Sequence, residues 1–157
     1  MELKGARSAA GCRFAVIVSA FNSDITEGLL RGAREALTGA SVSEADVTIV
    51  RVPGAFEIPV TALELGASGR FDAIICIGCV IKGDTMHFEY IAGATCNGIA
   101  EAASATGVPM ALGVLTTLTE EQAQDRAASG PGNKGREAAE AAIEMATLFR
   151  RLRAEAE

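Results

Sequence analysis

The nine residues AIICIGCVI, from Ala73 to Ile81, form an unbroken apolar run between Asp72 and Lys82. A run of this length, rich in β-branched side chains and lacking polar alternation, favours a β-strand that is covered on both faces. Strands of this kind are typical of parallel sheets with helices on either side. The run therefore favours an α/β fold over an antiparallel sheet with one face in solvent.

Three similar runs lie elsewhere in the chain, at 13–20, 47–52 and 108–116. Helical segments are expected between and after the four runs, at about 24–37, 57–67, 88–105, 119–128 and 134–153. The order β-α-β-α-β-α-β-α-α predicts a three-layer sandwich with right-handed crossovers. Because no linker or repeat divides the chain, we expect one domain over residues 1–157, with its core over about 13–153.

Local signals predict where two of the helices begin. Ser23 or Asp24 can cap the helix that starts near residue 24. Thr119 and Gln122 have the spacing of a capping box, which predicts the start of the short helix after the fourth run.

Composition and charge exclude several classes of function. Acidic residues outnumber basic ones, 20 to 14, and the only basic cluster is Arg150, Arg151 and Arg153, so a general nucleic-acid surface is not expected. The first residues lack the apolar segment of a secretory signal, and no apolar run approaches the roughly 20 residues of a membrane span. We therefore expect a cytoplasmic protein that binds neither nucleic acid nor membrane.

The four cysteines are Cys12, Cys76, Cys79 and Cys96. Cys76 and Cys79 have the C-x-x-C spacing of some zinc and redox sites. Residues three apart on a strand point to opposite faces, however, and a single histidine offers little further ligation. Buried free thiols in a reducing compartment are the favoured interpretation, and no metal is expected.

The only histidine, His87, follows the central apolar run. In open α/β sheets, ligands bind beyond the carboxyl ends of the strands. Gly83 allows a sharp turn there, and the amides of Asp84 and Thr85 would open onto a helix start, which is an anion-binding arrangement. His87 is suited to proton transfer at neutral pH, but a lone histidine is more often a surface or core residue.

The other strand ends carry further candidates, each with an ordinary alternative. Phe21 after the first run is either a ligand-stacking ring or a stray hydrophobe. The segment VPGAFEIP, 52–59, is either a rigid turn or a set of amides that read a planar heterocycle. Arg126 is either a phosphate ligand or a surface arginine in contact with Glu121 or Gln122 at helical spacing.

Taken together, five segments resemble the 6,7-dimethyl-8-ribityllumazine synthase family. They are SAFN (19–22), VPGAFEIP (52–59), GCVIKGDTMHFEYI (78–91), GVLTTLTEEQAQDRA (113–127) and GNKGREAAEAAIEM (132–145). The likeness runs from about Phe14 to Phe149. It implies a flavodoxin-like parallel sheet of strand order 2-1-3-4. It also implies condensation of 5-amino-6-(D-ribitylamino)uracil with 3,4-dihydroxy-2-butanone 4-phosphate, a step of riboflavin biosynthesis that needs no metal or organic cofactor.

The resemblance also implies a role for each matched residue. His87 corresponds to the family's proton-transfer residue, and Phe21 to the ring that stacks on the pyrimidine. The phosphorylated ketone is expected to meet Asp84, Thr85 and Arg126. The uracil edge and ribityl chain are expected to meet positions at the ends of the second and third strands, namely Ala55, Phe56, Glu57, Cys79, Val80 and Ile81.

Two positions depart from the family pattern, which often has arginine at Ala20 and an aromatic residue at Leu112. The resemblance further implies pentamers, in which Leu112 and Arg126 of one subunit meet Phe21 of the next. The turn 128–135 carries no insertion, which slightly favours a 60-subunit shell, although the lysine often found before its Gly-Asn pair is absent. Association with riboflavin synthase is a further expectation.

Two rival interpretations remain open. A flavin- or nucleotide-binding module would explain the sheet and the phosphate-binding turn, but not His87 or Arg126. An inactive shell protein would not explain the retention of Phe21, Glu57, His87 and Arg126.

Overall fold

The computed structural model describes residues 1–157 and contains one sheet of four parallel strands. The strands are β1 (Phe14–Ser19), β2 (Val47–Val52), β3 (Ala73–Ile81) and β4 (Met110–Thr117). Their order across the sheet is β2-β1-β3-β4, as the resemblance implied. The fourth strand begins two residues later than predicted, because Pro109 has no amide hydrogen to donate to a strand ladder.

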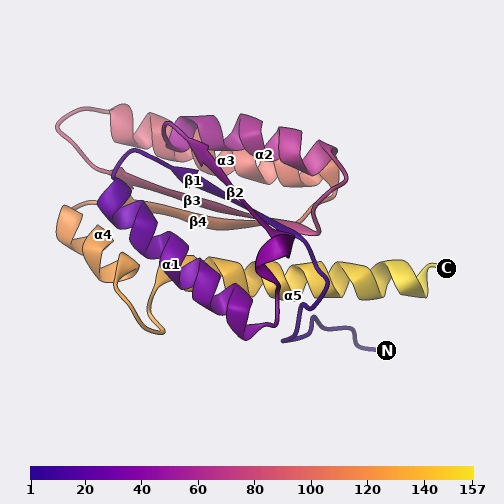
Figure 1. The fold of residues 1–157 in the computed structure, drawn as a ribbon. Coiled ribbons are helices and arrows are strands. Elements are labelled where there is room, and N and C mark those ends of the chain that lie inside the picture. The colour runs from indigo at the N-terminus through magenta and orange to yellow at the C-terminus, as the bar shows by residue number, and fades with distance from the viewer.

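Five α-helices cover the sheet in two layers, giving the predicted flavodoxin-like sandwich. They are α1 (Ser23–Gly39), α2 (Ile58–Ala67), α3 (His87–Thr106), α4 (Glu120–Ala127) and α5 (Lys134–Glu155), and two short 3-10 helices are η1 (Glu44–Asp46) and η2 (Ala55–Glu57). Helices α2 and α3 lie on one face of the sheet, and α1, α4 and α5 lie on the other (Figure 1). No helix is both long enough and apolar enough to cross a bilayer.

The central strand β3 is buried on both faces, which is why its sequence shows no polar alternation. Ile75 and Cys79 belong to the apolar cluster under α1, α4 and α5. Ile74 and Cys76 belong to the cluster under α2 and α3. The prediction that the two cysteines point to opposite faces is confirmed.

Burial also determines the chemistry of these two thiols. It raises the pKa of Cys76 to about 12 and that of Cys79 to about 11, the latter with help from the nearby Asp24 carboxylate. Both thiols therefore stay protonated near neutral pH and are poor nucleophiles.

One predicted helix cap is wrong and the other is confirmed. The residue before α1 is Asn22, in a left-handed conformation with φ 57°, and neither Ser23 nor Asp24 caps the helix. Asparagine tolerates this backbone conformation, and its side-chain amide donates a hydrogen bond to strand β3 instead of capping the helix. At α4, Thr119 Oγ1 accepts a hydrogen bond from the Gln122 amide at 3.2 Å, as the capping spacing indicated.

The first turn of α5 packs against α1 without room for a side chain. A Cβ placed on Gly135 would lie 1.9 Å from the Leu29 carbonyl oxygen. We expect Gly135→Ala to lower the free energy of unfolding by about 1–3 kcal/mol, because one helix must shift to relieve the clash. Urea unfolding followed by circular dichroism measures this change.

Gly39, at the end of α1, provides the matched control. A Cβ there would meet no atom within 4 Å, so Gly39→Ala should leave stability unchanged or raise it by up to about 1 kcal/mol through helix propensity. Equal unfolding midpoints for the two variants would contradict the close contact between α5 and α1.

Candidate active site

Strand β3 extends beyond its neighbour β1 at the carboxyl end of the sheet. Its pairing with β1 ends at Val18–Ile77, whereas its pairing with β4 continues to Ile81–Thr117. The last four residues of β3 therefore have a strand on one side only. Asn22 Nδ2 donates to the Cys79 carbonyl oxygen at 3.0 Å on the other side. The main-chain N–H and C=O of Ile81 face the same open side as those of Cys79, because the direction of these groups repeats every second residue along a strand.

The turns after β1 and β2 lie beside this open edge and are joined to each other. The Ala20 amide donates to the Val52 carbonyl oxygen at 2.8 Å, and the Phe21 amide donates to that of Pro53 at 3.0 Å. The rings of Phe21 and Phe56 are 70% and 60% exposed, which is unusual for large apolar side chains. These two turns therefore present aromatic surface at the strand ends.

Other predicted residues of these turns are less accessible. Ala55 and Cys79 have buried side chains that belong to the two apolar clusters. A ligand at this edge would therefore meet them through the main chain. Glu57 is half-buried and lies at the end of η2, just before α2.

The turn after β3 carries the histidine. The Lys82 amide donates to the Thr117 carbonyl oxygen at 2.8 Å, and residues 82–87 are all exposed. The His87 amide donates to Thr85 Oγ1 at 3.4 Å, so the threonine hydroxyl hydrogen is left to donate elsewhere. His87 is the first residue of α3, whose 20 residues add a partial positive charge at this end.

A separate hollow of about 330 Å³ lies between β4 and the helices α4 and α5, and it contains Leu112 and Arg126. Arg126 Nη1 donates to the main-chain carbonyl oxygen of Gln122 at 3.0 Å, whereas the Gln122 side chain accepts from the Leu118 amide, so the side-chain pair that the sequence allowed is not formed with this residue. Lys134 and Glu137 also line this hollow, and their side chains form an ion pair of 2.8 Å. The sequence did not single out Lys134 or Glu137, because only the fold brings the start of α5 beside α4.

The predicted residues, with Lys134 and Glu137 added from the structure, thus fall into two groups. We call Phe21, Ala55–Glu57, Cys79–Ile81, Asp84, Thr85 and His87 the strand-end group, because all follow or end β1, β2 or β3. We call Leu112, Arg126, Lys134 and Glu137 the cation hollow. No member of the strand-end group lines the cation hollow of the same chain.

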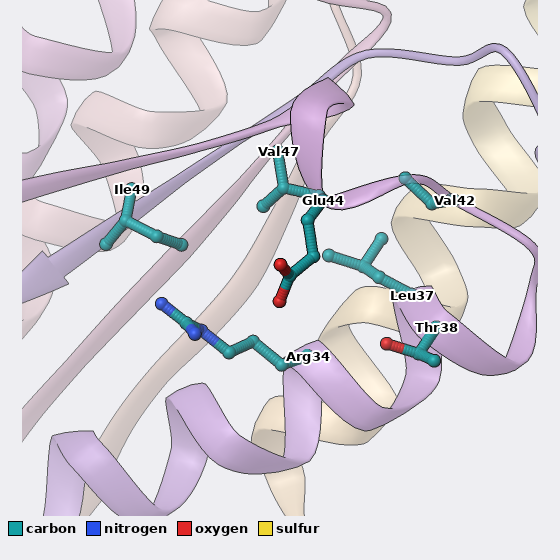
Figure 2. Close-up of a pocket in the computed structure, with 7 residues that line it drawn as sticks. All are labelled: Arg34, Leu37, Thr38, Val42, Glu44, Val47 and Ile49. Carbon is teal, nitrogen blue, oxygen red and sulfur yellow. The ribbon is translucent and has the colours of Figure 1, made fainter.

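A further hollow shown in Figure 2 lies at the opposite end of the sheet. Arg34 from α1 and Glu44 from η1 extend into it from two sides, and its other lining residues include Val47 and Ile49 at the start of β2 (Figure 2). It contains none of the predicted site residues. Its position at the amino end of the strands separates it from the expected ligand-binding edge.

Comparison with known proteins decides among the families compatible with this fold. The model of the 6,7-dimethyl-8-ribityllumazine synthase family matches residues 11–150. The chain belongs to this family. A relative from Syntrophus aciditrophicus (strain SB), named 6,7-dimethyl-8-ribityllumazine synthase, is 50% identical over 149 residues, covering 95% of this chain and 97% of the relative. The resemblance read from the five segments is confirmed, and the chain is an enzyme of the lumazine-forming class in riboflavin biosynthesis.

Proposed function

We propose that this lumazine synthase family member condenses 5-amino-6-(D-ribitylamino)uracil with 3,4-dihydroxy-2-butanone 4-phosphate, and releases phosphate and water. The amine attacks the ketone to form a Schiff base with loss of water. Elimination of phosphate leaves a second carbonyl on the four-carbon unit, and attack of the ribitylamino nitrogen on that carbonyl, with loss of a second water, closes the ring and gives the lumazine. The observation that carries the proposal is a pair of complementary surfaces, one aromatic with a histidine and one cationic.

The strand-end group is proposed to hold the aminouracil. The exposed Phe21 ring offers a face for stacking on the pyrimidine, and Phe56 stands on the adjoining turn. Main-chain groups of Ala55 and Ile81 can form hydrogen bonds with the edge of the heterocycle, since both residues lie where a ligand at the strand ends would meet the main chain before the side chain. Glu57 is proposed to bond the ribityl chain.

The cation hollow is proposed to bind the phosphate of the ketone. Arg126 offers a planar fork of donors that matches phosphate oxygens, and Lys134 adds a second cation beside it. Glu137 Oε2 lies 2.8 Å from Lys134 Nζ and keeps this cation beside the hollow. Asp84 and Thr85 belong to the strand-end group, and we assign them to the ketone on the strength of the resemblance.

His87 is proposed to transfer protons during Schiff-base formation and phosphate elimination. Holding amine and ketone together contributes up to roughly 7–11 kcal/mol in favourable cases. Proton transfer by a positioned side chain adds about 10²–10⁴-fold. His87 is therefore expected to accelerate a reaction that the site already promotes by positioning.

The separation of the two groups supports a site shared between subunits. The cation hollow borders β4, an outer strand of the sheet, so it can face the strand-end group of an adjacent chain. Leu112 in this hollow is 54% exposed and would then close over the pyrimidine pocket without offering a stacking ring. We propose pentamers on this basis, with Arg126 and Leu112 of one subunit completing the site around Phe21 of its neighbour.

A shell of sixty subunits is the favoured larger assembly, and riboflavin synthase is its proposed associate. Native mass spectrometry separates the forms, because the particle should have five or sixty times the 16.1 kDa chain mass. A monomer mass under assay conditions, with full activity, would contradict the shared site.

The reaction itself is tested by mixing the two purified substrates with the enzyme. The expected result is appearance of lumazine absorbance and fluorescence together with stoichiometric release of inorganic phosphate. Tight binding of flavin mononucleotide with no lumazine formed would instead support a flavin-binding module.

A further inference from the structure

Asn133 lies between the two cations of the hollow in sequence and is almost completely buried, at 2% exposure. Its Oδ1 accepts hydrogen bonds from the amides of Gly135 at 2.9 Å and Arg136 at 3.0 Å, which caps α5. An N-cap needs only this oxygen. The other half of the amide makes contacts that helix capping does not explain.

Asn133 Nδ2 donates to three carbonyl oxygens, one in α1, one at the end of α4 and one in the turn that joins α4 to α5. The acceptors are Gly28 in α1 at 3.1 Å, Ala127 at the end of α4 at 3.0 Å, and Ala128 at 3.1 Å. The last carbonyls of a helix have no partners within it, so the amide satisfies groups that α4 leaves open. One side chain therefore joins the end of α4, the start of α5 and the middle of α1.

Helix α1 is shaped to receive this amide. A Cβ on Gly32 would lie 2.1 Å from Asn133 Oδ1, and a Cβ on Gly28 would lie 2.7 Å from the Ala127 carbonyl oxygen. The two glycines are four residues apart and so share one face of α1. The turn between α4 and α5 is thus seated in a notch that any larger side chain at either glycine would fill.

The cations of the hollow adjoin this buried junction directly. Arg126 precedes Ala127, and Lys134 follows Asn133. The only hydrogen bond of the Arg126 side chain is to its own helix at Gln122, and that of Lys134 is to its own helix at Glu137. No side-chain hydrogen bond joins α4 to α5 through either cation. Their separation therefore depends on how the backbones of α4 and α5 are held.

We infer that Asn133 is a positioning residue for phosphate binding, fixing the spacing of Arg126 and Lys134 by clamping α4 and α5 onto α1. The inference rests on the proposed function, which assigns the cation hollow to the phosphate of the ketone. Asn133 is buried beneath the hollow and is not proposed to touch either substrate. Its effect should appear in the binding of phosphate-bearing ligands and not in the binding of the pyrimidine.

Asn133→Ser separates the two roles of the amide. The serine oxygen can still cap α5, but it is too short to reach the carbonyls of α1 and α4. We expect the dissociation constant of inorganic phosphate, measured by calorimetry, and the KM for the butanone phosphate each to rise about 10-fold or more, because small misplacements of binding groups are costly. The KM for the aminouracil should stay within about twofold of wild type, since Asn133 lies outside the strand-end group.

Thr147→Val is the matched control for lost stability. Thr147 is buried in α5, and its hydroxyl accepts a hydrogen bond from the Ala6 amide at 2.7 Å, far along the helix from the hollow. The Thr147→Val variant should have a lower melting temperature, as Asn133→Ser should, but its affinity for phosphate should equal that of wild type. If Asn133→Ser does not fold, Gly32→Ala is measured in its place. The added Cβ at position 32 of α1 would push the Asn133 side-chain amide out of its notch, so the same changes in phosphate affinity and in KM are expected.

Arg126→Ala, measured in parallel, separates failure of this inference from failure of the proposed function. If Arg126→Ala weakens phosphate binding and Asn133→Ser lowers only the melting temperature, the positioning role is overturned and the phosphate hollow stands. If Arg126→Ala leaves phosphate binding unchanged, the assignment of the hollow is wrong, and the role of Asn133 is overturned with it.

Discussion

Replacement of Arg126 by alanine is expected to lower kcat/KM for the butanone phosphate by about 10³-fold, with the larger share in KM. The guanidinium is exposed and contacts only the Gln122 carbonyl of its own helix, so no other protein group depends on it. Stability should therefore stay within about 0.5 kcal/mol of wild type. Steady-state kinetics with both substrates varied measures the effect, and the KM for the aminouracil should change little.

Two further variants define what the arginine contributes. Arg126→Lys keeps the charge but loses the planar fork, so an intermediate loss is expected. Arg151→Ala removes an exposed charge near the other end of α5 and should leave both Michaelis constants unchanged. A wild-type KM for the butanone phosphate in Arg126→Ala would contradict the assignment of the cation hollow to phosphate.

Replacement of His87 by alanine is expected to lower kcat by about 10²-fold, at the low end of the range for general acid–base catalysis. The side chain is exposed at the start of α3, so water can enter and carry part of the proton transfer. Both Michaelis constants should change little, because His87 is proposed to act on the reacting atoms and not to anchor either substrate. Single-turnover kinetics separates the chemical step from product release.

His87→Asn serves as the comparison for the histidine variant. It keeps a polar side chain of similar reach that cannot transfer a proton at neutral pH, and it should be as slow as His87→Ala. Wild-type kcat in His87→Asn would show that hydrogen bonding, and not proton transfer, is the contribution of this position.

Much of the fold was predictable because the decisive residues act locally or through alternation. The apolar run from Ala73 to Ile81 has no polar face, so it required helices on both sides. Side chains alternate between the two faces of a strand, so the sequence correctly predicted that Cys76 and Cys79 point to opposite faces and lie in different apolar clusters. Thr119 revealed the start of α4 because its capping contact is only three residues away.

Other features were not predictable because they depend on contacts between distant segments. Asn22 was missed as the residue before α1, because its side chain bonds β3 instead of the adjacent helix. Lys134 and Glu137 were not identified as lining a hollow with Arg126, since the packing of α5 beside β4 is a tertiary property. The role of Asn133 depends on Gly28, more than a hundred residues away in the chain.

The central claim, that one site is built from the strand-end group of one chain and the cation hollow of another, is tested most directly by mixing two impaired variants and assaying them at a butanone phosphate concentration well below the wild-type KM. Equal amounts of His87→Ala and Arg126→Ala chains would be coexpressed and purified as mixed assemblies. Random assembly should make about a quarter of the sites from one intact half of each kind, and so restore about a quarter of wild-type activity. Activity no greater than the mean of the two parent variants would contradict the shared site.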